Sequence, residues 1–127
     1  MDNQKQVYNA FYKSQDRFLE KECQCGFEPD IISEYLHWGM IIASRYEQGS
    51  KHENPLMCEM FLRQIYFHLL EAIRDPNRTH VFRQICLDSI HTPLLSLKRY
   101  YSHWEDGDLN FLKLQQLLQR LQTPLDE

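Results

Sequence analysis

The spacing of apolar residues is the sequence feature that most restricts how this chain can fold. In each long segment they recur every three or four positions, which places them on one side of a helix. The pattern is clear in the first segment, QVYNAFYKSQDRFLEK, and in the last, LNFLKLQQLLQRLQ. No segment alternates apolar and polar residues as a half-buried strand does. The chain is therefore predicted to be all-α.

Short polar breaks divide the chain into a bundle of five or six helices with short connections. Glycine, proline and small polar residues in these breaks indicate where helices begin and end. The expected caps and stops are Asp30 and Gly49 for the second helix, Asn54 and Pro55 for the third, Thr79 for the fourth, Thr92 and Pro93 for the fifth, and Asp108 for the last.

The apolar content is sufficient for one domain spanning residues 1–127. Of the 127 residues, 43% are hydrophobic and 13% are aromatic, and a chain of this length can bury a core of its own. Residues 35–46 are apolar nearly all round, so the second helix is predicted to be central. The expected buried residues of the first, third and fourth helices are Val7, Tyr8, Phe11, Tyr12, Phe18 and Leu19; Met57, Met60, Phe61, Ile65, Leu69 and Ile73; and Val81, Phe82, Ile85 and Ile90.

Cysteine usage and hydropathy favour a cytoplasmic protein. Four cysteines are few for a secreted scaffold, the chain starts without a signal segment, and its apolar runs are too short to span a membrane. Cys23 and Cys25 form one Cys-x-Cys pair, whereas structural zinc sites usually have two close ligand pairs. We therefore expect no metal and no cofactor.

Acidic residues are concentrated in two stretches of the chain. The formal net charge is −4, with −4 in residues 20–34 and −3 in residues 105–108, so the remainder carries +3. Both stretches lie near aromatic residues. Such a stretch is either a solvated surface or a docking surface for a basic partner. The residues concerned are Glu20, Glu22, Glu28, Asp30, Glu34, Tyr35 and Trp38 in the first stretch, and Tyr100, Tyr101, Trp104, Glu105, Asp106 and Asp108 in the second.

A short motif in the middle of the chain resembles an RNA-cleaving site. Arg74, Asp75 and His80 have the spacing Arg-Asp-x4-His, which resembles the signature of the HEPN ribonuclease superfamily, whose domains are all-α. The resemblance implies a homodimer that cleaves RNA without a metal. Arg74 and His80 would contact the phosphate and transfer the proton, and Asp75 would be the polar residue after the arginine.

The same stretch is also explained as a turn between two helices. Pro76 and Asn77 are turn residues, and Thr79 suits a helix cap. An RNA groove would need several basic side chains. The arginines near the motif are Arg74, Arg78 and Arg83.

We therefore predict a non-catalytic binding protein that docks a basic protein partner and neutralises or regulates it. The most concrete form is an immunity protein that blocks a nuclease toxin of the contact-dependent inhibition type, a likeness of size, charge and helicity. Its carboxylates would pair with the lysines and arginines that otherwise hold nucleic-acid phosphates. No direct contact with nucleic acid or membrane is expected, and the choice between monomer and homodimer stays open. The predicted partner-binding residues are Glu20, Glu22, Glu28, Asp30, Glu34, Trp38, Tyr101, Trp104, Glu105, Asp106 and Asp108. The alternative is a HEPN-like ribonuclease that uses Arg74, Asp75 and His80.

Overall fold

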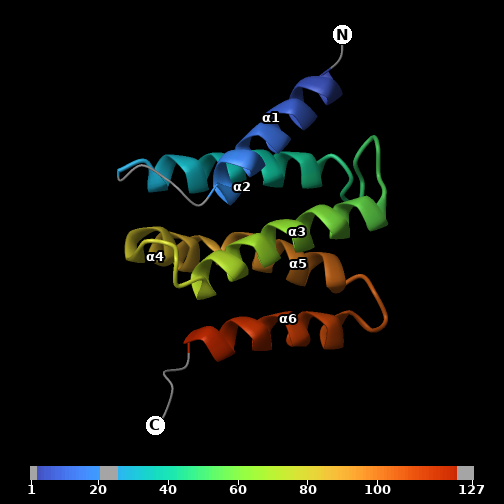
Figure 1. Ribbon diagram of the computed structural model, residues 1–127. Helices are drawn as coiled ribbons and strands as arrows, with labels where there is room; N and C mark the ends of the chain where they lie inside the picture. Colours follow the sequence, from blue (N-terminus) through green and yellow to red (C-terminus); the bar gives the residue numbers. More distant parts are fainter. Residues whose placement is uncertain (1–2, 21–25, 123–127) are drawn as a thin grey trace.

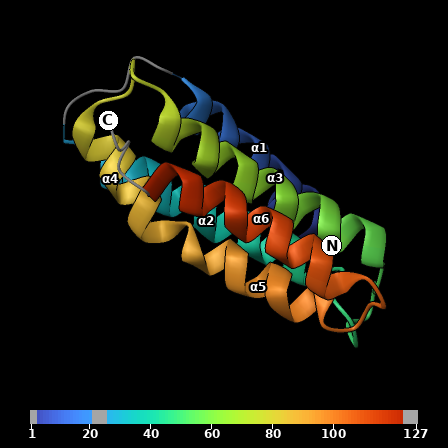
Figure 2. The same ribbon diagram turned by 90° about the horizontal axis from the view of Figure 1, so that it is seen from below.

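Helix α3 (Pro55–Arg74) is the longest helix and lies among the others, as two perpendicular views of the computed structural model show (Figures 1 and 2). The structure describes residues 3–20 and 26–122. The other helices are α1 (Asn3–Leu19), α2 (Glu28–Ser44), α4 (His80–Ser89), α5 (His91–Tyr101) and α6 (Gly107–Gln122). The described residues contain no strand, so the prediction of an all-α bundle is confirmed.

The helices form successive layers in Figure 1, with α2 above α3 and α5, and α6 below them. Helix α3 packs against α2, α4, α5 and α6, whereas α2 packs against α1, α3 and α4. The predicted central position of the second helix is therefore shared with α3. None of the helices in the described ranges is long and apolar enough to cross a membrane.

Aromatic rings from four helices form much of the core. Phe11 of α1 meets Phe61 of α3 edge to face at 5.5 Å between ring centroids. Phe18, also on α1, lies 4.7 Å from Tyr35 of α2 and 5.3 Å from Phe82 of α4. Each of these five side chains is fully or almost fully buried. Aromatic pairs of this kind stabilise a core beyond the area they bury.

Several predicted core residues are exposed. Met60 and Val81 are about half exposed, as are Tyr12 and Leu19 on α1. Tyr12 and Leu19 lie at the edge of the buried face of α1, whereas helical spacing places Met60 and Val81 away from the buried faces of α3 and α4. The sequence pattern therefore identified most of each buried face but included residues that lie outside it.

Two of the predicted helix starts are confirmed in atomic detail. The Asn54 side chain accepts a hydrogen bond from the Met57 N–H at 3.3 Å, and Pro55 is the first residue of α3. Thr79 caps α4 in the same way, because its Oγ1 accepts a hydrogen bond from the Phe82 N–H at 3.1 Å. Both caps satisfy amide groups that have no partner inside the helix.

Other predicted boundaries are wrong. Helix α2 begins at Glu28, so Asp30 is inside its first turn, and it ends at Ser44, before Gly49. Asp108 is the second residue of α6 and not its cap. Thr92 is inside α5, because the break between α4 and α5 falls at Ile90.

The break at Ile90 is explained by Pro93, three residues further along. Proline has no N–H to donate to the carbonyl of the residue four positions earlier, and its ring crowds that carbonyl. The residue concerned is Ser89, the last residue of α4. The helical bonds resume with Leu94, whose N–H donates to the Ile90 carbonyl at 3.2 Å.

Candidate functional site

The first acidic stretch lies where α1 ends and α2 begins, and its acids have different environments. Glu20, Asp30 and Glu34 are exposed, and Glu34 pairs with Arg17 at 2.5 Å. Glu28 is only 3% exposed, and its Oε1 accepts a hydrogen bond from the Gly26 N–H at 2.7 Å. Glu28 therefore stabilises the entry to α2, and we leave it out of any docking surface. Glu22 lies outside the described residues, as do Cys23 and Cys25.

The turn with the HEPN-like spacing lies at the same end of the molecule as this acidic stretch (Figure 1). Arg74 is the last residue of α3 and His80 is the first of α4, and both are exposed. Arg74 faces Glu71 at 3.7 Å. Asp75 takes part in the turn, because its Oδ1 accepts a hydrogen bond from the Asn77 N–H at 2.9 Å. Neither Arg74 nor His80 lines the hollows described below.

The other two arginines near this turn bind helix ends. Arg78 is only 8% exposed and donates to the carbonyl oxygens of Phe18 and Glu20, at 2.6 and 3.0 Å. Its guanidinium also lies 4.4 Å from the centre of the Phe82 ring. Arg83 donates to the Ile73 carbonyl at 2.8 Å, close to the end of α3. Both side chains satisfy carbonyl groups left over at helix C-termini. These hydrogen bonds hold both guanidinium groups against the backbone of the helix ends.

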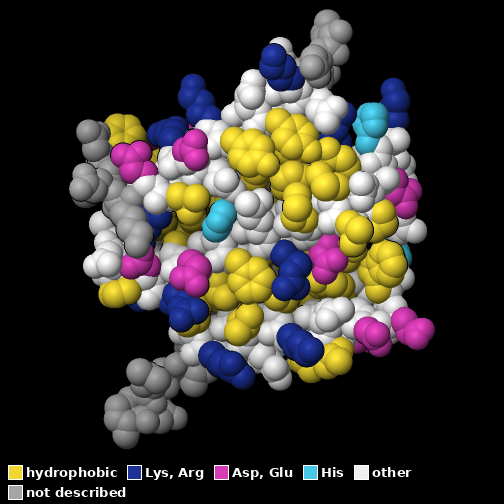
Figure 3. Space-filling view, turned by 45° about the vertical axis from the view of Figure 1, so that its right-hand side comes forward, with side chains coloured by type: hydrophobic (Ala, Val, Ile, Leu, Met, Phe, Trp, Pro, Cys, Tyr) yellow, Lys and Arg dark blue, Asp and Glu magenta, His cyan; other side chains and the backbone are white. Residues whose placement is uncertain are grey.

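The second acidic stretch forms the connection from α5 to α6, and we call residues 102–108 the acidic tip. Trp104 is 49% exposed, and Glu105, Asp106 and Asp108 are exposed. None of these three carboxylates has an ion-pair partner among residues 3–20 and 26–122. Figure 3 shows acidic side chains together at this end of the molecule. The tip therefore presents negative charge beside an exposed aromatic ring.

Backbone hydrogen bonds between residues three apart in the chain order the acidic tip. The Trp104 N–H donates to the Tyr101 carbonyl, and the Gly107 N–H donates to the Trp104 carbonyl, both at 3.1 Å. A Cβ atom on Gly107 would lie 1.7 Å from the Tyr101 carbonyl oxygen. Only glycine therefore allows α6 to begin so close to the end of α5.

The two acidic stretches lie at opposite ends of the molecule in both ribbon views (Figures 1 and 2). Trp38 lies in the middle of α2 and is half-buried against the core. Tyr101 is 3% exposed, so it cannot contact a partner in this conformation. The predicted docking residues therefore do not form one surface. Among those that the structure describes, more are exposed at the acidic tip than at the other end.

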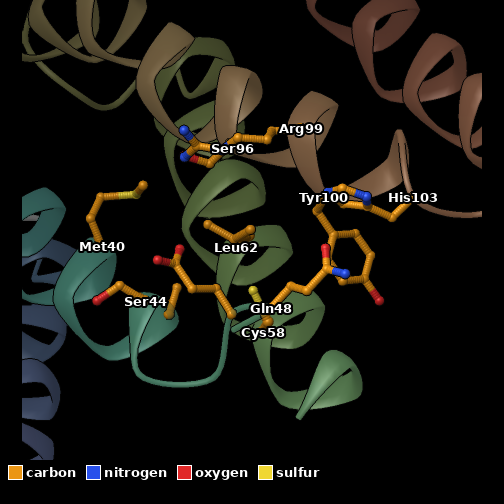
Figure 4. Close-up of a pocket in the computed structure, with 11 residues that line it drawn as sticks. Met40, Ser44, Gln48, Cys58, Leu62, Ser96, Arg99, Tyr100 and His103 are labelled. Atoms are coloured by element: carbon orange, nitrogen blue, oxygen red, sulfur yellow. The ribbon is translucent and has the colours of Figure 1, made fainter. Parts of the chain in front are cut away.

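A groove of about 540 Å³ runs from α2 across α3 to α5 (Figure 4). Arg99 borders it on one side, and Glu47 is among its other lining residues. The Cys58 thiol lies in its floor, and burial raises the pKa of that thiol to about 11. The thiol is therefore protonated at neutral pH and is not a reactive nucleophile.

A smaller hollow of about 190 Å³ adjoins this groove and reaches the acidic tip; we call it the aromatic pocket. Tyr46, Tyr100 and Trp104 supply its aromatic lining, and the Tyr100 and Trp104 ring centres are 5.8 Å apart. The remaining lining residues are Gln48, Glu53, Pro55, Cys58 and His103.

Glu59 of α3 holds the Tyr100 side chain that lines the aromatic pocket. Its two carboxylate oxygens accept hydrogen bonds from the Tyr100 and Tyr101 hydroxyls, at 3.4 and 2.6 Å. Burial, followed by the charge of Glu59, raises the pKa of Tyr100 to about 12. Tyr100 is therefore a neutral ring held in place by α3.

Sequence reasoning missed the pocket residues Tyr46 and Glu53, which lie on the connection between α2 and α3, far from the tip in the chain. It also chose Tyr101 over Tyr100 as a docking residue. The helical spacing of Leu94, Leu97 and Tyr101 could have shown that Tyr101 faces the core, because residues three and four apart share one face. Within the described residues, no cluster of three or more His, Cys, Asp or Glu side chains could hold a metal ion.

Comparisons with known proteins give no match to a family model, a curated protein or a solved structure. The function is therefore inferred from the geometry of the surface.

Proposed function

We propose that this chain is a non-catalytic binding protein that docks a basic protein partner through its acidic tip. The observation that carries the proposal is the half-exposed Trp104 beside three exposed carboxylates that have no ion-pair partner among the described residues. Exposed tryptophan supplies much of the binding energy at protein interfaces, and complementary charge accelerates encounter. The most concrete form of this function is an inhibitor that covers the phosphate-binding surface of a nuclease toxin.

The rigidity of the tip supports this role. A surface that is already ordered loses less conformational entropy when it binds. The hydrogen bonds of Trp104 and Gly107 order the backbone before any partner arrives. The opposite end of the molecule supports docking less well, because Glu28 is buried and Glu34 is paired with Arg17.

The test is affinity capture from a lysate of the native host, read by mass spectrometry, with three baits. The first bait is the wild-type chain. The second neutralises the tip through Glu105→Gln, Asp106→Asn and Asp108→Asn, and the third neutralises the other end through Glu20→Gln, Asp30→Asn and Glu34→Gln. We expect the wild type and the third bait to capture the same basic protein and the second bait to lose it.

The captured protein is then purified and its binding measured at two salt concentrations. A docking surface of this kind weakens as salt rises, because exposed charges are screened. If the tip variant binds as tightly as the wild type, the acidic tip is not the docking surface. If instead the purified chain forms a homodimer that cleaves RNA, and His80→Ala abolishes cleavage, the chain is a ribonuclease and the proposal is overturned.

A further inference from the structure

We infer that the aromatic pocket receives one arginine side chain of the basic partner. This inference rests on the proposed function and names the contact at its centre. The pocket measures about 190 Å³, and its lining combines three aromatic residues, the buried Tyr46, Tyr100 and the half-exposed Trp104, with the acidic residue Glu53. An arginine guanidinium is attracted to the faces of such rings and stacks on them readily.

The position of Glu53 makes the pocket selective for a cation. Its Oε1 accepts a hydrogen bond from the Gly49 N–H at 3.2 Å, and Gly49 holds the positive φ of 88° that the turn needs. The carboxylate is thus anchored by backbone, while the acids of the tip add negative charge beyond Trp104. A guanidinium that lies over the exposed Trp104 ring and reaches the Glu53 carboxylate makes both a cation–π contact and a charge-assisted hydrogen bond.

The neighbouring groove is a poorer site for the same cation. Its border includes Arg99, whose side chain extends over the groove in Figure 4. In the groove the charge of Arg99 opposes that of Glu47, whereas the aromatic pocket is lined, among the described residues, by Glu53 and by no lysine or arginine, so an incoming guanidinium is directed toward the end that holds Glu53. His103 lines both hollows and therefore does not distinguish them.

The two tryptophans of the chain make a direct binding assay possible. In the full-length Trp38→Phe variant, Trp104 is the only tryptophan, so its fluorescence reports on the pocket. The probes are two capped peptides, acetyl-Gly-Arg-Gly-amide and the same peptide with citrulline, which has the shape of arginine without its charge. We expect the arginine peptide to change Trp104 emission saturably, with an affinity about fivefold above that of the citrulline peptide.

Two further substitutions in that background test the lining of the pocket. Glu53→Gln removes the carboxylate and keeps the volume, and we expect it to weaken the arginine peptide about fivefold. Glu71→Gln removes an exposed carboxylate from the far end of α3 and is expected to leave binding unchanged. Equal binding of the two peptides, an arginine peptide without effect on Trp104, or an unchanged affinity in Glu53→Gln would each overturn the inference.

The outcome for the whole partner separates this inference from the proposed function. If neutralising the tip abolishes partner binding but Glu53→Gln does not weaken it, the docking function stands and the arginine contact is wrong. If the arginine peptide binds the pocket but no basic partner depends on the tip, the docking function is wrong although the pocket binds a guanidinium.

Discussion

At the scale of single residues, a chain of buried polar side chains connects the first three helices. Gln15 of α1 donates through its Nε2 to the Tyr35 hydroxyl at 3.4 Å, and that hydroxyl lies 2.5 Å from Nδ1 of His68 on α3. Burial raises the pKa of Tyr35 and lowers the pKa of His68. Tyr35 therefore stays protonated, and its hydroxyl donates a hydrogen bond to the unprotonated Nδ1 of a neutral histidine.

This arrangement predicts that acid weakens the fold through His68. Its pKa in the folded chain lies below the ordinary value of 6.5, so as pH falls the unfolded chain binds the proton first. The stability that the neutral histidine provides is complete above about pH 6.5 and is lost progressively below it. Urea unfolding between pH 7.5 and pH 5 checks this. In His68→Gln, the free energy of unfolding should fall less over this pH range than in the wild type. His91→Gln, at an exposed position, should retain the dependence of the wild type; equal slopes for wild type and His68→Gln would exclude this role.

The sequence shows which residues lie near the HEPN-like motif, but it does not show which groups their side chains contact. Arg78 and Arg83 belong to a basic cluster in the sequence, and in the fold both are hydrogen-bonded to backbone carbonyls. The partners of Arg78 are about 60 residues away in the chain, a distance that local spacing does not cover. Glu28 was likewise predicted from its charge alone, which does not reveal that its side chain is buried.

At the scale of elements, the helices were predictable because each has its own apolar period, whereas several boundaries were not. Asn54 and Thr79 were identified because their side chains cap the helix directly. The start of α2 was missed because its cap residue, Phe27, makes no side-chain hydrogen bond to the helix. The local signals at this start are Pro29 in the first turn and the hydrogen bond from the Gly26 N–H to Glu28, and neither is a side-chain cap.

The close approach of α2 and α3 depends on Gly39. A Cβ atom at that position would lie 2.6 Å from Cδ1 and 2.8 Å from Cγ1 of Ile65, which is fully buried. Alanine in place of a helical glycine normally adds up to about 1 kcal/mol of stability, whereas overpacking a core costs about 1–3 kcal/mol. The clash is therefore expected to dominate.

We predict that Gly39→Ala lowers the free energy of unfolding by about 1 kcal/mol. Ile65→Val removes Cδ1, so in the Gly39→Ala background it should cost less than it does in the wild type. Chemical denaturation of the two single variants and the double variant measures this coupling. Ser33→Ala, at an exposed position of α2, is the control and should change stability little. Additive effects of Gly39→Ala and Ile65→Val would contradict the clash.

At the scale of the whole molecule, the helices share one core, which predicts a single unfolding transition. Buried residues of all six helices belong to one continuous cluster. Far-UV circular dichroism follows all helices, and in a Trp104→Phe variant the fluorescence of Trp38 follows α2 alone. The two urea midpoints should coincide, as they do for two-state domains. An earlier midpoint for Trp38 would show that α2 unfolds before the rest of the molecule.

Docking through the acidic tip, as proposed, would separate recognition from folding. The exposed side chains between Ser102 and Asp108 project from a turn whose shape depends on the backbone and on Gly107. Residues at these exposed positions can therefore be exchanged without disturbing the core, provided that Gly107 is kept. A set of variants with the same helices and different tip residues would be a library of binders with graded specificity. The same freedom would allow the tip sequence to change in evolution together with the surface of its partner.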